Sequence, residues 1–296
     1  MRNILPIIAL LLLTMCNNGE TDFDATGNFE TDEVIVSSEA SGKILKLKIE
    51  EGTTLTAGQN VGYIDTLQLF LRKKQLEYSV GAVLAKKPNA DVQLSALREQ
   101  MATARREQTR IENLLKADAA TQKQLDDIKA QIDLLQKQYN ALQSSLTIST
   151  QSLQSETLPL KAQLDQVEDQ IKKSIIINPI QGTVLTRYAL QDEVTGQGKA
   201  LYKIADLTSL ILRAYLNGNQ LAEIKLGQQV KVLVDGPDGG YKNYEGNILW
   251  ISDKAEFTPK TIQTKDERAN LVYAVKIKVK NDGFIKIGMY GEVKFK

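Results

Sequence analysis

Cys16, the one cysteine of the chain, is the residue with the clearest chemical setting. It follows Arg2 and an apolar run over residues 4–13. That run is too short to cross a hydrocarbon core, which needs about 20 residues, so we expect residues 1–15 to be an export signal. Cys16 lies where lipoprotein signals place the cysteine whose thiol carries the lipid. Met15 is larger than the small residue usual at its position, so an ordinary signal peptide with an incidental cysteine stays the alternative.

Few other residues are placed to do chemistry. The chain has no histidine, which removes the commonest general base and metal ligand, and a single cysteine excludes internal disulfides and thiolate clusters. Asp126 and Asp127 are adjacent on an expected helix and point apart. The loop at 235–240, DGPDGG, lacks the alternating carboxylates of a calcium loop. We therefore predict that the chain is not an enzyme and uses no cofactor or metal.

The charge balance bears on whether the chain binds nucleic acid. With 37 basic and 36 acidic residues the net charge is +1, which gives no overall field for nucleic-acid binding, so we predict none. Residues 16–31 are polar and acidic, as expected of a flexible tether.

The clearest periodic pattern, over residues 67–173, predicts an antiparallel coiled-coil hairpin. Apolar positions recur in steps of three and four on both sides of a short break at 116–122, where Thr121 is a predicted N-cap. We expect Pro88 to interrupt the first arm and Pro159 the second. The predicted seam residues are Leu94, Leu97, Met101, Ala104, Gln108, Ile111 and Leu115 on the first arm, and Leu125, Ile128, Ile132, Leu135, Tyr139, Leu142 and Leu146 on the second.

Both flanks of the hairpin have β-patterns. Residues 32–66 and 174–206 repeat one plan, in which Gly42 corresponds to Gly182. Neither half would bury a core alone, so we expect one β-sandwich split by the hairpin. Residues 207–296 contain about five further strand patterns with glycine turns and predict a small β-barrel. The fold class is thus an elongated α+β protein.

This order of segments resembles the HlyD-like membrane fusion proteins, which are periplasmic adaptors. Their lipoyl-like domain, a barrel-sandwich hybrid, is split by an α-helical hairpin and followed by a β-barrel. The stretch Ala255–Val279 is similar to the barrel of adaptors that serve ABC exporters, and Ile287–Val293 to the turn that ends these barrels. Many pump adaptors carry a further membrane-proximal domain, whereas this chain ends at Lys296, which favours an ABC exporter.

The resemblance implies a function. It implies an adaptor in the periplasm of a Gram-negative bacterium, lipid-anchored at the inner membrane. Its partners would be an exporter (an ABC permease with its ATPase, or a proton-driven RND pump) and an outer-membrane channel, and its copies would form a ring, with six the expectation. In the family, an Arg, a Leu and a Ser at the hairpin tip dock into the channel. The matching positions here are Arg110, Leu114 and Thr121, a hydroxyl residue in place of Ser.

Three alternatives stay open. Arg110 could be a solvated coil residue and Thr121 only a helix cap. A carrier domain that holds lipoate or biotin would present a Lys in a tight turn between the two halves, where this chain has the hairpin instead. A coiled-coil tether without a transport role would explain the hairpin and the export signal, but not the sandwich and the barrel.

Overall fold

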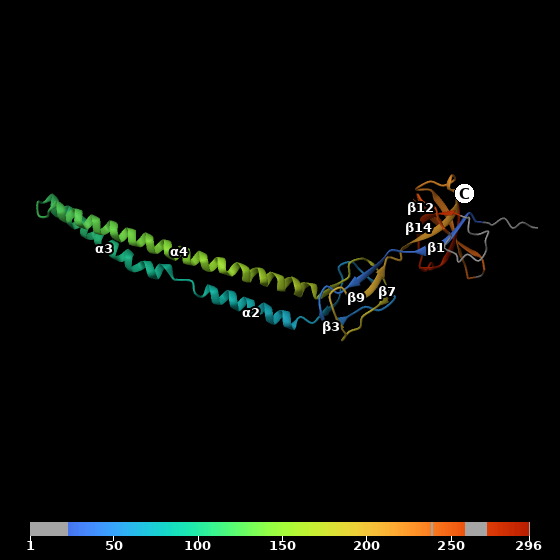
Figure 1. Cartoon of the computed structure of the whole chain (residues 1–296), viewed down its shortest axis with the longest axis horizontal. Helices are drawn as coiled ribbons and strands as arrows, with labels where there is room; N and C mark the ends of the chain where they lie inside the picture. Colours follow the sequence, from blue (N-terminus) through green and yellow to red (C-terminus); the bar gives the residue numbers. More distant parts are fainter. Residues whose placement is uncertain (1–22, 238, 258–270, 296) are drawn as a thin grey trace, which may run out of the picture.

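The computed structural model describes residues 23–237, 239–257 and 271–295. Three parts follow one another along the long axis of the molecule: a helical hairpin, a β-sandwich and a β-barrel (Figure 1). The predicted elongated α+β fold, with a hairpin inserted into a split sandwich and a barrel beside it, is confirmed.

Helices α2 (Leu67–Leu84) and α3 (Ala90–Lys116) form the first arm of the hairpin, and α4 (Gln122–Lys173) forms the second. Both α2 and α3 pack along α4. The predicted interruption at Pro88 is confirmed, because α2 ends before it and α3 begins after it. Asn89 then caps α3, as its side-chain oxygen accepts a hydrogen bond from the Val92 N–H at 3.2 Å.

The prediction that Pro159 interrupts the second arm is wrong, because α4 continues from Gln122 to Lys173. Proline removes one helical hydrogen bond and costs roughly 3 kcal/mol inside a helix. The helix is held on both sides of this residue. Thr157 is buried before it, with its hydroxyl donating to the Gln154 carbonyl at 2.6 Å, and Val167 is buried after it. Packing against α2 therefore outweighs the local penalty.

The predicted seam is best defined in the half of the hairpin near the turn. Ala104, Leu125 and Ile128 are buried there and form one cluster. Ile111, Leu115, Ile132 and Leu135 pack against it as partly buried neighbours. The heptad pattern in the sequence is therefore the contact surface between α3 and α4.

The sandwich consists of two four-stranded sheets, and each sheet takes strands from before and after the hairpin. One sheet has the order β2 (Glu33–Ser37), β9 (Ala200–Ala205), β7 (Gly182–Arg187) and β4 (Thr54–Leu55). The other has the order β6 (Ile175–Ile177), β5 (Asn60–Ile64), β3 (Gly42–Leu47) and β8 (Val194–Thr195). The strands before the hairpin correspond to those after it: β2 to β6, β3 to β7, β4 to β8 and β5 to β9. When each strand is replaced by its counterpart, the order of one sheet becomes the order of the other.

The register confirms the predicted correspondence of the two glycines. Gly42 pairs with Thr195, and Gly182 pairs with Leu55, at equivalent places in the two sheets. A side chain at Gly182 would bring its Cβ to 2.5 Å from the Ala205 carbonyl oxygen, so the close approach of β9 requires glycine there.

Six strands close the barrel, in the order β10 (Ser209–Asn217), β1 (Ala25–Glu30), β15 (Tyr290–Lys294), β11 (Gln229–Asp235), β12 (Tyr241–Ile251) and β14 (Leu271–Lys280). A pairing of β10 with β14 completes the circle. The short strand β13 (Glu256–Phe257) pairs with β14, and the one-turn helix α5 (Gly218–Leu221) follows β10. The buried core of the barrel includes Leu212, Val232, Ile277 and Val293.

The prediction of a flexible tether over residues 16–31 is wrong for residues 25–30, which form strand β1. Residues 25–30 lie between β10 and β15 in the barrel, where Ala25 and Phe29 are buried in the core. The segment has an alternating inward face, but that face holds only one large apolar side chain, Phe29. From residue 25 onward the chain therefore passes from the barrel through the sandwich to the hairpin, and it returns through the sandwich to the remaining strands of the barrel.

Candidate functional site at the hairpin tip

The turn between α3 and α4 is a closed, hydrogen-bonded structure. Asp118, the residue after the C-cap Ala117 of α3, takes the left-handed backbone conformation with φ of 54°. Its N–H donates to the Leu115 carbonyl at 3.1 Å, and the Ala119 N–H donates to the Leu114 carbonyl at 2.9 Å. This pair of bonds is the Schellman motif, which satisfies carbonyls at a helix end. The last turn of α3 is thus fixed where Leu114 lies.

The predicted N-cap at Thr121 is confirmed. Its hydroxyl oxygen accepts a hydrogen bond from the Gln124 N–H at 3.3 Å, and the Gln124 side-chain oxygen accepts from the Thr121 N–H at 2.8 Å. This reciprocal capping box satisfies main-chain donors at the start of α4. The hydroxyl also donates to the Gln124 side-chain oxygen at 3.2 Å, so it already has a partner within the chain.

The two other tip residues lie one turn apart on α3 and face solvent. The Arg110 side chain is 70% exposed and makes an ion pair with Glu107 at 3.5 Å. Leu114 is 38% exposed, whereas its neighbour Leu115 packs into the seam. The structure therefore brings Arg110, Leu114 and Thr121 into the last turns on either side of the tip. Leu114 is an apolar side chain that the hairpin itself does not cover.

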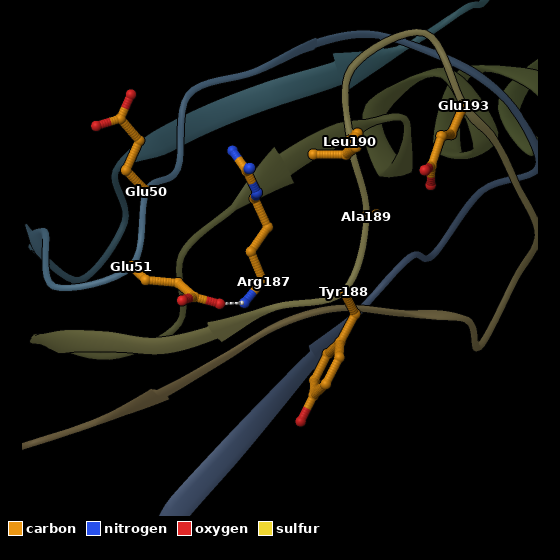
Figure 2. Close-up of a pocket in the computed structure, with 7 residues that line it drawn as sticks. All are labelled: Glu50, Glu51, Arg187, Tyr188, Ala189, Leu190 and Glu193. Carbon is orange, nitrogen blue, oxygen red and sulfur yellow. Dashed lines mark hydrogen bonds between the residues drawn. The ribbon is translucent and has the colours of Figure 1, made fainter.

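A second candidate site is a hollow on the sandwich between the loops at 48–53 and 187–193. Figure 2 shows Glu50 and Glu51 on one loop and Glu193 on the other, with carboxylates that point in different directions rather than converging on one point. Glu51 accepts a hydrogen bond from the Arg187 main-chain N–H at 2.9 Å, and the Arg187 guanidinium donates to the Ile49 carbonyl at 3.3 Å. These contacts join the two halves of the sandwich, so the arrangement is explained as structural.

Comparisons with known proteins agree with this architecture. No family model matches the chain. A curated relative, the UPF0194 membrane protein YbhG of Salmonella arizonae, is 27% identical over 294 residues, which cover 91% of this chain and 87% of YbhG. The membrane fusion protein Spr0693 from Streptococcus pneumoniae R6 has a TM-score of 0.50 at 19% identity, covering 92% of this chain and 98% of that one. MacA from Actinobacillus actinomycetemcomitans gives 0.53 at 19% identity, covering 91% and 76%.

The chain has the fold of a membrane fusion protein. The resemblance predicted from the order of segments is thereby confirmed. At 19% identity the solved structures establish the fold and not the roles of single residues.

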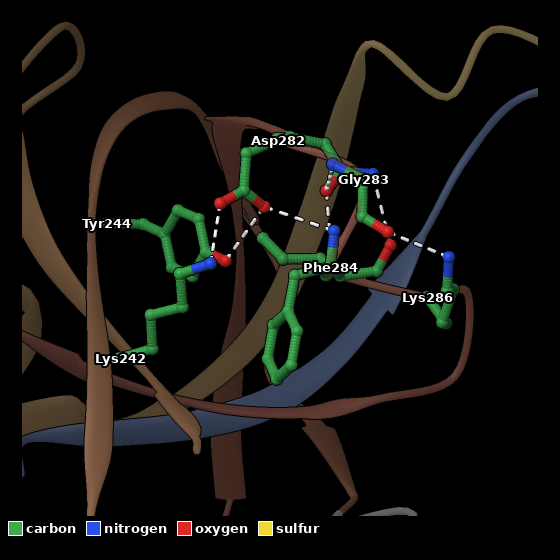
Figure 3. A network of polar contacts seen from close by, with 8 residues as sticks. Lys242, Tyr244, Asp282, Gly283, Phe284 and Lys286 are labelled. Carbon is green, nitrogen blue, oxygen red and sulfur yellow. Dashed lines mark hydrogen bonds and ion pairs between the residues drawn. The ribbon is translucent and has the colours of Figure 1, made fainter. Parts of the chain in front are cut away.

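The barrel of this membrane fusion fold contains a polar network that the sequence did not reveal (Figure 3). Asp282 accepts hydrogen bonds from the Lys242 ammonium at 2.6 Å, from the Tyr244 hydroxyl at 3.1 Å and from the Phe284 N–H at 3.1 Å. These donors, Lys242 first, lower the pKa of Asp282 to about 2. The sequence Asn281-Asp282-Gly283 is a turn signal that predicts the loop, but no local signal identifies Lys242 as the partner.

Within the described residues, no three His, Cys, Asp or Glu side chains are grouped to hold a metal ion. In the same part of the chain, every helix is too short or too polar to cross a bilayer. Cys16 and the expected signal peptide lie outside the described residues.

Proposed function

We propose that this chain is a periplasmic adaptor that links an inner-membrane exporter of the ABC type to an outer-membrane channel. Cys16 carries a lipid that holds the barrel end at the inner membrane. Copies of the chain form a ring, expected to have six members, and the hairpins extend from it toward the channel. The chain performs no catalysis of its own in this assembly.

The observation that carries the proposal is the separation between the entry of the N-terminal segment and the hairpin tip. Strand β1, residues 25–30, lies in the barrel, and the tip lies at the opposite end of the molecule (Figure 1). Helix α4 alone has 52 residues. At about 1.5 Å per residue it measures about 78 Å, a length suited to bridging part of the space between two membranes.

The tip has the properties of a docking surface. An exposed guanidinium can bind carbonyls or carboxylates of a partner through two parallel hydrogen bonds, and among the described residues Arg110 makes a weak surface ion pair with Glu107. Leu114 offers an apolar contact that is fixed by the Schellman turn. Each contact can be modest, because a ring presents all the tips at once and so multiplies their effect.

Arg110→Asp tests the channel contact. We expect it to weaken tip docking about tenfold or more per copy, since a lost charge-assisted hydrogen bond costs about 1.5–3 kcal/mol. Export and crosslinking of the tip to the channel should both fall. The matched control is Arg106→Asp, one turn farther from the tip, where the side chain is 67% exposed and pairs with Glu99 at 3.4 Å. Equal effects of the two substitutions, or none, would contradict docking at Arg110.

Thr121 can be tested apart from its capping role. Asparagine also caps helices well but has no hydroxyl, so Thr121→Asn should keep α4 stable. If the hydroxyl reaches the channel through its remaining lone pair, export should fall in this variant and return with Thr121→Ser. If Thr121→Asn exports normally, the residue serves only as a cap.

The lipid anchor is tested by Cys16→Ser. We expect this variant to leave the membrane fraction and appear in the periplasmic extract, because no thiol remains to carry the lipid. Intact mass of the natural chain should show the added acyl groups. A variant that stays membrane-bound at natural levels would show that another contact suffices.

A further inference from the structure

The barrel carries exposed apolar side chains at the end that lies away from the sandwich. Strand β1 leaves for the sandwich after Glu30, so its first residue, Ala25, marks the other end of the barrel. The pairings of β1 with β10, of β10 with β14 and of β14 with β12 place the last residues of β12 at that end as well. There Leu226, Leu249 and Trp250 are 67%, 54% and 39% exposed. We call these three residues the distal patch.

A β-bulge turns the tryptophan of this patch outward. The pairing of β12 with β14 shifts register between Ile248 and Trp250, while Ile248 is in the barrel core and Ile251 packs against it. Regular alternation from Ile248 would point Trp250 inward and Ile251 outward. With the bulge, the adjacent residues Leu249 and Trp250 are both exposed. The fold thus presents a large apolar ring to its surroundings instead of burying it, which is explained by a partner.

Hydrogen bonds fix Leu226 beside these two residues of β12. The Gly227 N–H donates to the Ile248 carbonyl at 2.8 Å, and the Ile248 N–H donates to the Gln228 carbonyl at 3.0 Å. The loop that carries Leu226 is therefore bonded to the strand that carries Leu249. The distal patch is held by main-chain contacts, so its side chains keep a constant direction relative to the barrel.

The segment that leads back to Cys16 leaves the barrel at the same end. The Asp24 carboxylate accepts a hydrogen bond from the Phe295 N–H at 2.7 Å, and the Gln228 side chain donates to the Phe295 carbonyl at 3.0 Å. Asp24 is thereby tied to the loop next to Leu226. Asp24 lies eight residues along the chain from Cys16, and a stretch of that length spans at most about 28 Å. A lipid on Cys16 therefore keeps Asp24 within about this distance of a bilayer.

The composition of this end suits a lipid surface. Residues 17–22 contain no apolar side chain, and residues 258–270, five of which are charged, contain a single large aliphatic one, so neither segment provides an apolar cover. The stretches 223–226 and 252–254 each carry one acidic and one basic residue, so neither has a net charge that would attract a strongly charged partner. Leucine enters the apolar part of a membrane surface, and tryptophan is enriched at the level of the headgroups.

We propose that the distal patch lies in the membrane surface, with Leu226 and Leu249 among the acyl chains and the Trp250 ring at the level of the headgroups. This inference rests on the proposed function, in which a lipid on Cys16 holds the barrel at the inner membrane. Confinement by the tether raises the effective concentration of the surface, so three side chains suffice for a contact that is weak without it. The patch has a fixed place on the barrel, so the contact also sets the direction of the barrel, which a tether alone leaves free.

Trp250 reports the contact directly, because it is the single tryptophan of the chain. The full mature chain, residues 16–296, is coupled through the Cys16 thiol to a maleimide lipid in vesicles of phosphatidylethanolamine and phosphatidylglycerol. Lipids with acyl chains brominated near the headgroup should quench Trp250, and its emission should lie at shorter wavelength than in the uncoupled chain. Leu226→Asp and Leu249→Asp should each lower the ratio of lipid-contacting to free barrel about tenfold.

The controls use the hairpin, which extends away from the bilayer in this arrangement. Leu134→Asp places the same charge at a leucine of α4 that is also exposed, 56%, and should leave the quenching unchanged. Trp250→Phe together with Leu134→Trp moves the tryptophan to the hairpin, where brominated lipids should not quench it. Raising the salt concentration should not change the quenching of Trp250, because the contact is apolar and not electrostatic.

The natural sequence decides the proposal without any substitution. If Trp250 is not quenched in the coupled chain, the membrane contact is overturned and the distal patch is assigned to a protein partner. That result leaves the proposed function standing, because the coupled lipid does not depend on acylation in the cell. Quenching that is lost at high salt, or that falls equally in Leu249→Asp and Leu134→Asp, would also overturn the contact. Quenching in the coupled chain, combined with an intact mass that shows no acyl group on the natural chain, would support the contact and count against the lipid anchor.

Discussion

Asn178→Ala removes a fully buried side chain that joins the two halves of the sandwich. The Asn178 amide nitrogen donates to the carbonyls of Thr56 at 2.8 Å and Ile180 at 2.5 Å. Its side-chain oxygen accepts from the Tyr202 hydroxyl at 3.0 Å. Burial raises the pKa of Tyr202 to about 12, so this hydroxyl stays protonated and remains a donor across the ordinary pH range.

The cost of the substitution follows from the groups left without partners. Each buried polar group without a hydrogen bond costs about 1–3 kcal/mol. The Tyr202 hydroxyl and the Ile180 carbonyl lose their Asn178 partner, whereas the Thr56 carbonyl keeps the Gln59 N–H at 3.3 Å. We therefore expect the free energy of unfolding to fall by about 2–6 kcal/mol, a large share of the 5–15 kcal/mol that stabilises a typical domain. Tyr202→Phe leaves only the Asn178 oxygen unpaired and should cost about 1–3 kcal/mol.

Hydrogen exchange measured by mass spectrometry resolves the effect by region. Peptides over 56–64 and 175–187 should exchange about thirtyfold or more faster in Asn178→Ala, since each 1.4 kcal/mol is a factor of ten. Barrel peptides should be unchanged, and so should the fluorescence of Trp250, the single tryptophan, which lies in β12. Unchanged exchange in the sandwich, or a cost for Tyr202→Phe equal to that for Asn178→Ala, would refute the reasoning.

Two further substitutions and one deletion test other parts of the molecule. Thr121→Ala removes the capping box and costs about 1 kcal/mol, so hydrogen exchange at the start of α4 should become about fivefold faster, whereas Thr121→Ser should exchange at the natural rate. Deleting residues 17–30 removes β1 and should lower the midpoint of barrel unfolding in urea, followed by Trp250 fluorescence, whereas deleting residues 17–23 should not; equal midpoints would contradict the role of Phe29 in the core. The Asp282 carboxylate has a pKa lower in the folded chain, about 2, than the value of about 3.9 expected when unfolded. Its stabilising effect is complete above pH about 4 and is lost as the pH falls toward 2, so Asp282→Asn should reduce the difference in thermal midpoint between these pH values. If the thermal midpoint of Asp282→Asn falls between these pH values as much as that of the natural chain, this network is not the source of the loss of stability in acid.

How far the sequence predicted the fold depended on whether a residue's role has a local signature. Leu125 and Ile128 lie in a 3.6-residue pattern, and such a pattern predicts both the helix and its buried face. Strand β1 has no comparable signature. Gly27 occupies an inward position where the main chain of β10 leaves no room for a side chain, so the segment looked polar and was predicted to be a tether. The tip residues were identified through a resemblance, because exposure and spacing alone do not distinguish a docking Arg from a solvated one.

Strand β1 also changes how the barrel is joined to the sandwich. The chain passes between them twice, once after Glu30 and once after Ala205, and both passages are short. The Thr31 hydroxyl donates to the Asp206 carbonyl at 3.2 Å across the two passages, and the Asn281 side chain donates to the Leu207 carbonyl at 3.0 Å from the barrel loop. A single linker could rotate freely, whereas two linkers tied together restrict rotation about the long axis. The direction of the hairpin is therefore coupled to the barrel, so an anchor at the barrel end can orient the tip at the far end.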